Sequence, residues 1–85
     1  MEIVFQPKAY EDIKYWKSIN NQTILDKISK LLASVKVNPY QGIGKPEPLK
    51  HKMTGMWSRR INEKHRLVYR LRNDVIMIYS LKDHY

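Results

Sequence analysis

The spacing of the hydrophobic residues changes once along this chain, and the change limits the folds it can adopt. Between residues 24 and 35 the apolar side chains recur with the 3.6-residue period of an amphipathic helix, at Ile24, Leu25, Ile28, Leu31, Leu32 and Val35. From residue 56 onward, apolar and polar side chains alternate, which is typical of strands with one buried face. A helical part followed by a strand-rich part predicts an α+β fold.

The chain has 85 residues, which are enough for one domain (1–85) and too few for separate binding and catalytic domains. A β-prone apolar run at residues 2–6 predicts a first strand. Pro7 suits the start of a first helix that ends at Asn20-Asn21, and Pro39 stops the second helix. Any functional site must therefore be built on the elements of one small core.

The last third of the chain predicts three antiparallel strands, at residues 56–61, 65–71 and 75–81. If both connecting turns contain three residues, Ile61 pairs with His65 and Leu71 pairs with Val75. The expected fold is therefore α+β, with two N-terminal helices packed on one face of a twisted, mainly antiparallel β-sheet.

Strand alternation in this register assigns every side chain to one face of the sheet. The face expected to pack on the helices holds Trp57, Ile61, Leu67, Tyr69, Leu71, Val75, Met77, Tyr79 and Leu81, together with Arg59 and His65. The other, more cationic face holds Ser58, Arg60, Arg66, Val68, Arg70, Ile76, Ile78 and Ser80, and the same parity adds Lys82 and His84. Because Arg60 lies directly opposite Arg66, either an anionic group lies between them or both side chains point into water.

The chain carries 16 Lys and Arg residues against 8 Asp and Glu residues, a formal net charge of +8. Such an excess favours polyanions, and phosphate backbones are the commonest polyanion in the cytoplasm. Solubility alone, or an acidic protein partner, are the alternatives that charge leaves open.

The absence of cysteine excludes disulfides, thiolate metal sites and cysteine nucleophiles. The three histidines are scattered and acidic residues are few, so no metal or other cofactor is expected. The N-terminus lacks the pattern of a secretory signal, and no apolar stretch approaches membrane-spanning length. We therefore expect a soluble, cytoplasmic protein with no membrane partner.

Two residues stand out as candidates for acid-base chemistry. Glu47 lies between Pro46 and Pro48 in a predicted loop, where the prolines restrict its backbone as a positioned general base would require. His84 lies next to the C-terminus, and histidine can release a proton near neutral pH. The alternatives are a loop carboxylate paired with a nearby lysine and a solvated tail histidine.

Together, a carboxylate, arginines and a histidine supply what is needed to cleave RNA through its own 2′-hydroxyl group. A base removes the hydroxyl proton, cations stabilise the additional negative charge on phosphorus, and an acid protonates the departing 5′-oxygen. DNA lacks this nucleophile, so the combination favours RNA.

Four segments of this chain resemble the YoeB/Txe toxins of the RelE/ParE superfamily. They are Gly44-Lys45-Pro46-Glu47-Pro48-Leu49-Lys50-His51, Gly55-Met56-Trp57-Ser58-Arg59-Arg60-Ile61, Glu63-Lys64-His65-Arg66-Leu67-Val68-Tyr69 and the ending His84-Tyr85. The resemblance covers nearly the whole chain and is specific from Gly42 onward. It implies a RelE-like microbial RNase fold and a bacterial type II toxin that cleaves mRNA in the A site of the 70S ribosome.

The resemblance also implies roles for individual residues. Carried over by position, Glu47 is the general base, Arg66 stabilises the phosphate, His84 is the general acid, and Tyr85 stacks on a base or shapes the site. Lys50, Arg59 and Arg60 fall in the basic RNA-facing motif, although strand parity assigns Arg59 to the core-facing set. The implied partners are an acidic, YefM-like antitoxin and a second copy of the toxin in a homodimer.

Two rival functions remain open at this point. One is a non-catalytic toxin of the same fold that acts by binding a protein, as the ParE gyrase poisons do. The other is a plain RNA-binding or ribosome-binding module, for which Glu47 would be dispensable.

Asp83, which precedes His84, is expected to raise the pKa of that histidine or to repel RNA.

Overall fold

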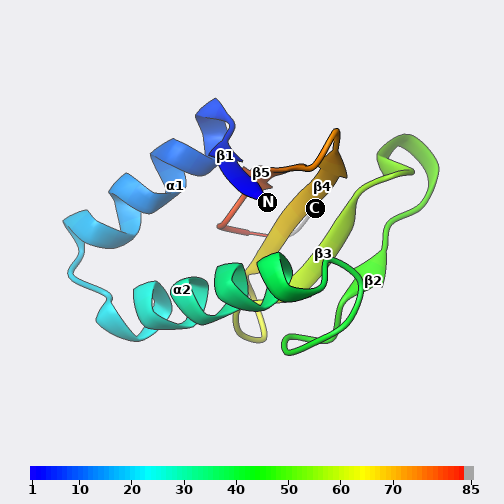
Figure 1. The fold of residues 1–85 in the computed structure, drawn as a ribbon. Helices are drawn as coiled ribbons and strands as arrows, with labels where there is room; N and C mark the ends of the chain where they lie inside the picture. Colours follow the sequence, from blue (N-terminus) through cyan, green and yellow to red (C-terminus); the bar gives the residue numbers. More distant parts are fainter. Residues whose placement is uncertain (84–85) are drawn as a thin grey trace.

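The computed structural model describes residues 1–83, and Figure 1 shows the arrangement of its elements. In chain order these are β1 (Glu2–Phe5), α1 (Pro7–Ser18), α2 (Gln22–Val37), β2 (Glu47–Pro48), a 3-10 turn (His51–Met53), β3 (Trp57–Arg60), β4 (Arg66–Arg72) and β5 (Val75–Ser80). The described strands form one sheet in the order β1-β5-β4-β3-β2. Only β1 pairs in parallel, with β5, and the other pairs are antiparallel.

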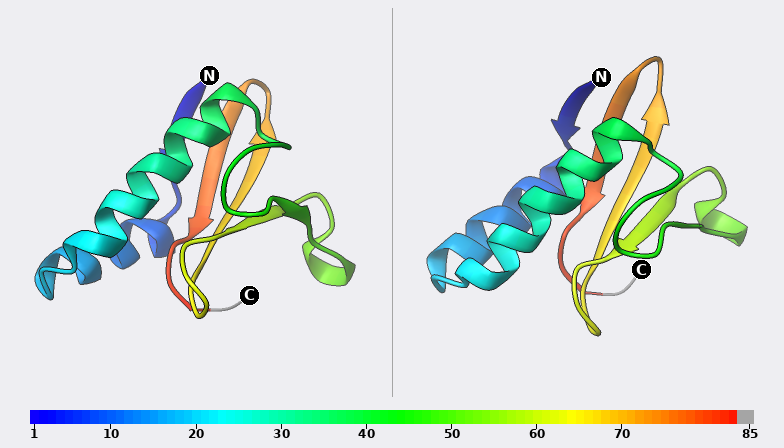
Figure 2. Two further views of the ribbon diagram at one scale, coloured as in Figure 1. Left: turned by 90° about the horizontal axis from the view of Figure 1, so that it is seen from below. Right: turned by 60° about the horizontal axis from the view of Figure 1, so that its bottom comes forward.

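The two helices lie together on one face of the sheet, and no helix packs on the other face, which we call the open or uncovered face (Figure 2). This arrangement confirms the predicted α+β fold with a mainly antiparallel sheet. Among residues 1–83, neither helix combines the length and the apolar character that crossing a membrane would need.

Local signals set the helix boundaries where the sequence predicts them. Pro7 occupies the first turn of α1, where its missing N–H group costs nothing. Asn20 ends the first helical region with a φ of 54°, and the side chain of Asn21 caps α2 by accepting a hydrogen bond from the Ile24 N–H at 3.1 Å. Helix α2 ends at Val37, before Pro39.

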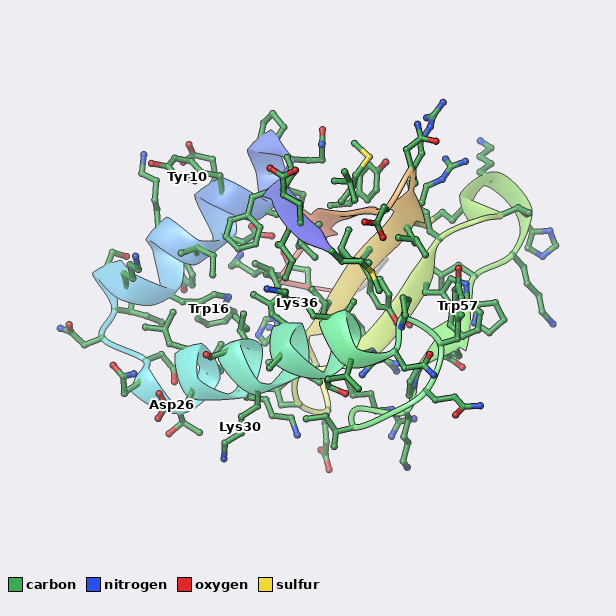
Figure 3. All side chains as sticks on the ribbon, viewed as in Figure 1. Tyr10, Trp16, Asp26, Lys30, Lys36 and Trp57 are labelled. Atoms are coloured by element: carbon green, nitrogen blue, oxygen red, sulfur yellow. The ribbon has the colours of Figure 1, made fainter. Side chains whose placement is uncertain are left out.

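The hydrophobic core fills the space between the helices and the sheet. Its buried members come from α1, α2, β4 and β5 and from residues that follow β3 and β5: Ala9, Trp16, Ile24, Ile28, Leu31, Val35, Ile61, Leu67, Tyr69, Ile76, Ile78 and Leu81. Figure 3 shows Trp16 on the inner side of α1, whereas Tyr10 on the same helix points away from the molecule. The apolar stripe of α2 is thus core, as its periodicity indicates.

The register between β3 and β4 agrees with prediction, because Arg60 pairs with Arg66. The register between β4 and β5 differs from prediction by one residue. The turn contains two residues, Asn73 and Asp74, which both have a positive φ, as a type I′ hairpin requires. Leu71 therefore pairs with Ile76 and not with Val75.

This shorter turn reverses the predicted faces of β5. Ile76 and Ile78 are completely buried in the core, whereas Val75, Met77 and Tyr79, which were expected there, are only partly buried. An irregularity opposite Val68 and Tyr69 then restores the expected parity, so that Ser80 pairs with Val68 on the open face. The two one-residue shifts add up to a two-residue shift in register, since Val68 was expected opposite Ile78. A shift of two residues keeps the same faces, so Leu81 is buried as predicted.

Candidate active site

Glu47 lies on an edge strand that the sequence analysis assigned to a loop. Strand β2 pairs antiparallel with β3, and Glu47 lies opposite Ser58. Proline is tolerated here because one side of an edge strand has no ladder partner. The chain then turns inward, where Leu49 is buried and its N–H group donates to the Met56 carbonyl at 2.9 Å.

This pairing places Glu47 on the uncovered face of the sheet. Residues that pair directly across antiparallel strands share a face, so Glu47, Ser58, Val68 and Ser80 form one row. The Ser58 hydroxyl in this row is buried and has no hydrogen-bond partner within residues 1–83. Arg66, the first residue of β4, lies two residues before Val68 and therefore points to the same face of the sheet.

Glu47 and Arg66 meet on this face. The Arg66 Nη1 atom lies 3.4 Å from Glu47 Oε1, and the exposed fractions of the two side chains are 15% and 52% respectively. A carboxylate thus lies beside Arg66, whereas the sequence left open whether an anionic group lies between Arg60 and Arg66 or both side chains point into water. The structure therefore brings together two of the predicted site residues, although they are 19 positions apart in the sequence.

A pocket of about 570 Å³ opens next to Glu47. It is lined by Glu47, Pro48, Leu49, Lys50, His51, Lys52 and Met53. Lys50, His51 and Lys52 are exposed, so the pocket adds two cations and one histidine to the carboxylate. Its chemistry suits a polyanion that approaches the open face.

Arg60 and Arg59 are neighbours in β3 with opposite environments. Arg60 is exposed, and its backbone N–H group donates to the Gly44 carbonyl at 2.7 Å. Arg59 is completely buried. Its side chain donates to the Tyr69 hydroxyl, to the Ser34 hydroxyl and to the carbonyls of Asn38, Gln41 and Ile43, at distances from 2.6 to 3.2 Å.

The structure does not present the side chain of Arg59 for the predicted contact with RNA. Each N–H group of the Arg59 guanidinium has one of these acceptors, and none of the groups reaches the surface. Strand parity, which assigned Arg59 to the core-facing set, agrees with the structure, whereas the role implied by the resemblance does not. Arg59 instead fixes the connection that leads from α2 to Glu47.

The last described residues, Leu81–Asp83, form a C-terminal arm that follows β5. The Asp12 carboxylate accepts from the Leu81 N–H group at 2.9 Å, and Trp16 Nε1 donates to the Leu81 carbonyl at 3.0 Å. Asp83 N–H donates to His65 Nδ1 at 2.7 Å, while Arg66 N–H donates to the Asp83 carbonyl at 3.3 Å. The arm therefore ends beside the backbone of Arg66.

His84 and Tyr85, the other predicted catalytic residues, lie outside the described residues. Asp83 is exposed and its side chain lies 3.4 Å from Lys82 Nζ. Reduced hydration raises the pKa of Asp83, but the hydrogen bond and the positive charge of Lys82 lower it more, so the pKa lies below its ordinary value. The residue before His84 is thus a carboxylate that is ionised at neutral pH.

Sequence reasoning missed the residues that hold the C-terminal arm. Asp12 and Trp16 were interpreted only as helix residues, and His65 only as a core residue. One signal was available, because a carboxylate at position 12 shares a helix face with Ala9 and Trp16, and a buried carboxylate requires partners. Within residues 1–83, no cluster of histidine and acidic side chains could hold a metal ion.

Comparison with known proteins gives a consistent result. A family model described as a YoeB-like toxin of bacterial type II toxin-antitoxin systems matches residues 5–85. Toxin YoeB of Escherichia coli (strain K12) is 40% identical over 85 residues, which cover 100% of both chains. The structure of a YoeB/ParE toxin from Agrobacterium tumefaciens covers 100% of both chains, with 36% identity and a TM-score of 0.95.

YoeB from Staphylococcus aureus has been solved in a heterotetrameric YoeB-YefM complex and as a YoeB dimer. Both structures share 48% identity with this chain, with a TM-score of 0.90, and cover 100% of this chain and 98% of the other. The fold and its open cationic face thus define a toxin of the RelE type. More narrowly, the chain belongs to the family of YoeB-like toxins of bacterial type II toxin-antitoxin systems.

Proposed function

We propose that this toxin is a ribosome-dependent endoribonuclease that cleaves mRNA in the ribosomal A site and so inhibits translation. The observation that carries the proposal is the 3.4 Å contact between Glu47 and Arg66 on the uncovered face of a strongly basic protein. This contact supplies a base and a cation at one point, where a phosphodiester group with its neighbouring 2′-hydroxyl can bind. Membership of the YoeB-like toxins supports the same chemistry.

In the proposed reaction, Glu47 removes the proton of the 2′-hydroxyl group, and the resulting oxygen attacks the adjacent phosphorus. A bond forms between phosphorus and the 2′-oxygen while the bond to the 5′-oxygen breaks. Arg66 stabilises the additional negative charge on the phosphoryl oxygens, and His84 donates its proton to the departing 5′-oxygen. The products are a 2′,3′-cyclic phosphate and a 5′-hydroxyl group, and no group from outside the chain is required.

The Glu47–Arg66 pair suits this reaction because it is weak. A partly exposed ion pair at 3.4 Å contributes at most about 1 kcal/mol to stability. A phosphate group can therefore replace the carboxylate as the partner of Arg66. Glu47 is then released toward the neighbouring hydroxyl group.

The RNA-binding surface is proposed to extend from this pair over the exposed cations of the open face. Lys50 lines the pocket beside Glu47, and Arg60 lies across from Arg66. Tyr85 is proposed to stack on a base or to shape the site. Substituting Lys50 or Arg60 by Gln should weaken RNA binding and reduce the slope of log K against log salt by about 1.

The partners of this toxin are proposed to be an acidic antitoxin and a second toxin copy. The net charge of +8 complements an acidic chain. The S. aureus relative supports both partners, because it was solved with YefM and as a dimer. Binding of a synthetic acidic antitoxin segment should weaken as salt increases.

The decisive experiment adds purified toxin to 70S ribosomes that are translating a defined mRNA and maps the new 5′ ends. We expect cuts only on ribosome-bound mRNA, and a fall of at least about 100-fold for Glu47→Gln or His84→Gln. Glu11→Gln, which changes an exposed carboxylate on α1, is the matched control and should cut at the wild-type rate.

Three results would contradict the proposal. Intact mRNA with wild-type toxin would exclude the activity, and broken DNA in its place would support a ParE-like poison. Full translation inhibition by Glu47→Ala would support a binding module without catalysis. The 5′-end map reports the cut itself, and parallel measurements of DNA integrity and of translation separate the other two outcomes.

A further inference from the structure

The C-terminal arm, Leu81–Asp83, is fixed more tightly than its lack of regular structure suggests. Its backbone groups bind side chains of α1 on one side and the start of β4 on the other. The Lys82 carbonyl also accepts from the Ser80 hydroxyl at 3.0 Å and from Lys8 Nζ at 3.4 Å. An arm with this many directed contacts follows one path, because each buried contact costs free energy when broken.

His65 makes the contact closest to the proposed site. It is buried, and its ring meets the ring of Trp16 edge to face, with centroids 4.8 Å apart. Its Nδ1 atom accepts the Asp83 N–H group at 2.7 Å, which requires that this nitrogen carry no proton. His65 immediately precedes Arg66, so one end of β4 binds both the arm and Glu47.

The two backbone hydrogen bonds of Asp83 fix the position of the arm relative to the start of β4. The Asp83 N–H group binds the side chain of His65, and the Asp83 carbonyl accepts from the backbone of Arg66. That carbonyl is the last described group before His84. The point at which the chain enters residue 84 is thus fixed relative to the guanidinium that meets Glu47.

We propose that His65 is a positioning residue for the general acid. Its Nδ1 acceptor holds the Asp83 amide and thereby keeps the end of the arm, from which His84 follows in the sequence, beside Arg66. The inference rests on the proposed function, because it assigns His65 to the catalytic geometry of that reaction. A role in core packing alone would require only the ring of His65, and not its acceptor.

A crossed pair of substitutions separates the acceptor from the ring. His65→Phe keeps a ring against Trp16 and removes the acceptor, whereas His65→Asn keeps an acceptor near the position of Nδ1 and removes most of the ring. Positioning predicts that His65→Phe lowers kcat for ribosome-bound mRNA about 10- to 100-fold with KM nearly unchanged, because small displacements of reacting groups have effects of this size. His65→Asn should restore most of kcat.

A second measurement does not depend on catalysis. In NMR hydrogen exchange, the Asp83 amide should be protected in wild type and in His65→Asn, and should exchange at least about 10-fold faster in His65→Phe. Amides in the centre of β4 serve as the internal control and should keep their protection. Should His65→Phe not fold, Trp16→Phe removes the donor to the Leu81 carbonyl, keeps an aromatic ring, and should lower kcat in the same way.

The outcomes are distinguishable. If wild-type toxin does not cleave mRNA, the proposed function fails, and the exchange of Asp83 still tests whether His65 holds the arm. If wild type cleaves and His65→Phe cleaves equally fast, or if Asp83 remains protected in His65→Phe, the positioning role is excluded. Activity retained by His65→Phe but lost by His65→Asn would show that the ring is what matters.

Discussion

Two irregular segments carry the proposed chemistry, and they are held in different ways. Residues 38–47 lead from α2 to Glu47, and three of their carbonyls bind the single side chain of Arg59, with further hydrogen bonds from the Tyr69 hydroxyl to Pro39 and from the Arg60 N–H group to Gly44. The C-terminal arm leads toward His84 and is held by side chains of α1, by the side chain of His65 and by the backbone N–H group of Arg66, each with one or two hydrogen bonds. One side chain therefore makes most of the contacts to the first segment, whereas support for the second is distributed over several side chains.

This difference explains why the sheet alone does not make the site. The open face supplies Arg66 from a regular strand, but a short edge strand and an arm outside the sheet lead to the two residues proposed to exchange protons. In both segments, buried polar side chains bind backbone groups that a strand ladder would otherwise satisfy. Substitutions of the residues that hold the two segments should therefore lower the free energy of unfolding by different amounts.

The largest expected effect is that of Arg59→Met. It leaves several buried acceptors without donors, each costing about 1–3 kcal/mol, so the free energy of unfolding should fall by more than about 3 kcal/mol. Arg60→Met is the matched control in the next position and should remain within about 0.5 kcal/mol of wild type, since Arg60 is exposed. Urea unfolding followed by circular dichroism measures both. Equal stabilities of the two variants would show that residues 38–47 are held by something other than Arg59.

A smaller effect is expected for Asp12→Ala at the other support. The variant leaves the buried Leu81 N–H group without its acceptor, which should cost about 1–3 kcal/mol. Asp12→Asn keeps an acceptor and should lose less. The neighbouring Glu11→Ala, which removes only an exposed 3.6 Å ion pair with Lys14, should change stability by less than about 0.5 kcal/mol in the same assay. A neutral Asp12→Ala would mean that Asp12 does not hold the arm.

The sequence predicted those parts of the fold that local signals control. Pro7, Asn21 and Pro39 set the helix boundaries through their own backbone requirements, so the boundaries agreed with the structure. The turn at Asn73-Asp74 was predicted to be one residue too long. Those residues accept either turn length, and the choice depends on burying Ile76 and Ile78.

The site was predicted less completely for a related reason. The proximity of Glu47 to Arg66 depends on the path of the segment that Arg59 holds, and Arg59 binds mainly backbone carbonyls. Every residue carries such a carbonyl, so the partners leave no pattern in the sequence. Two predictions were therefore made for Arg59. The resemblance assigned it to the RNA-facing motif, whereas strand alternation placed it on the buried face of the sheet.

The pH dependence of stability in the alkaline range tests the hydrogen bonds of Arg59 through one of its partners, Tyr69. Its hydroxyl donates to the Pro39 carbonyl and accepts from Arg59 Nε. Burial raises the pKa of Tyr69, and Arg59 only partly lowers it, so the folded protein keeps the phenolic proton above the ordinary value of 10.0. The unfolded chain loses that proton first, and the stabilisation is therefore complete below about pH 10 and is lost as pH rises further.

The matching measurement compares wild type with Tyr69→Phe by urea unfolding from pH 8 to pH 11. The wild type should be more stable by about 1 kcal/mol up to pH 10, with the difference shrinking above it. Ionisation of the lysines affects both proteins and cancels in the difference. A difference that stays constant to pH 11 would show that Tyr69 has no raised pKa.

The smallest effect on stability is expected for Glu47→Gln, the change with the greatest effect on the proposed chemistry. Glu47 is half exposed and its ion pair is weak, so the free energy of unfolding should change by less than about 0.5 kcal/mol. mRNA cleavage by the same sample should fall at least about 100-fold, because Gln cannot accept the hydroxyl proton. A loss of stability comparable to that of Arg59→Met would instead make Glu47 another structural support, and the loss of cleavage would then no longer identify it as the base.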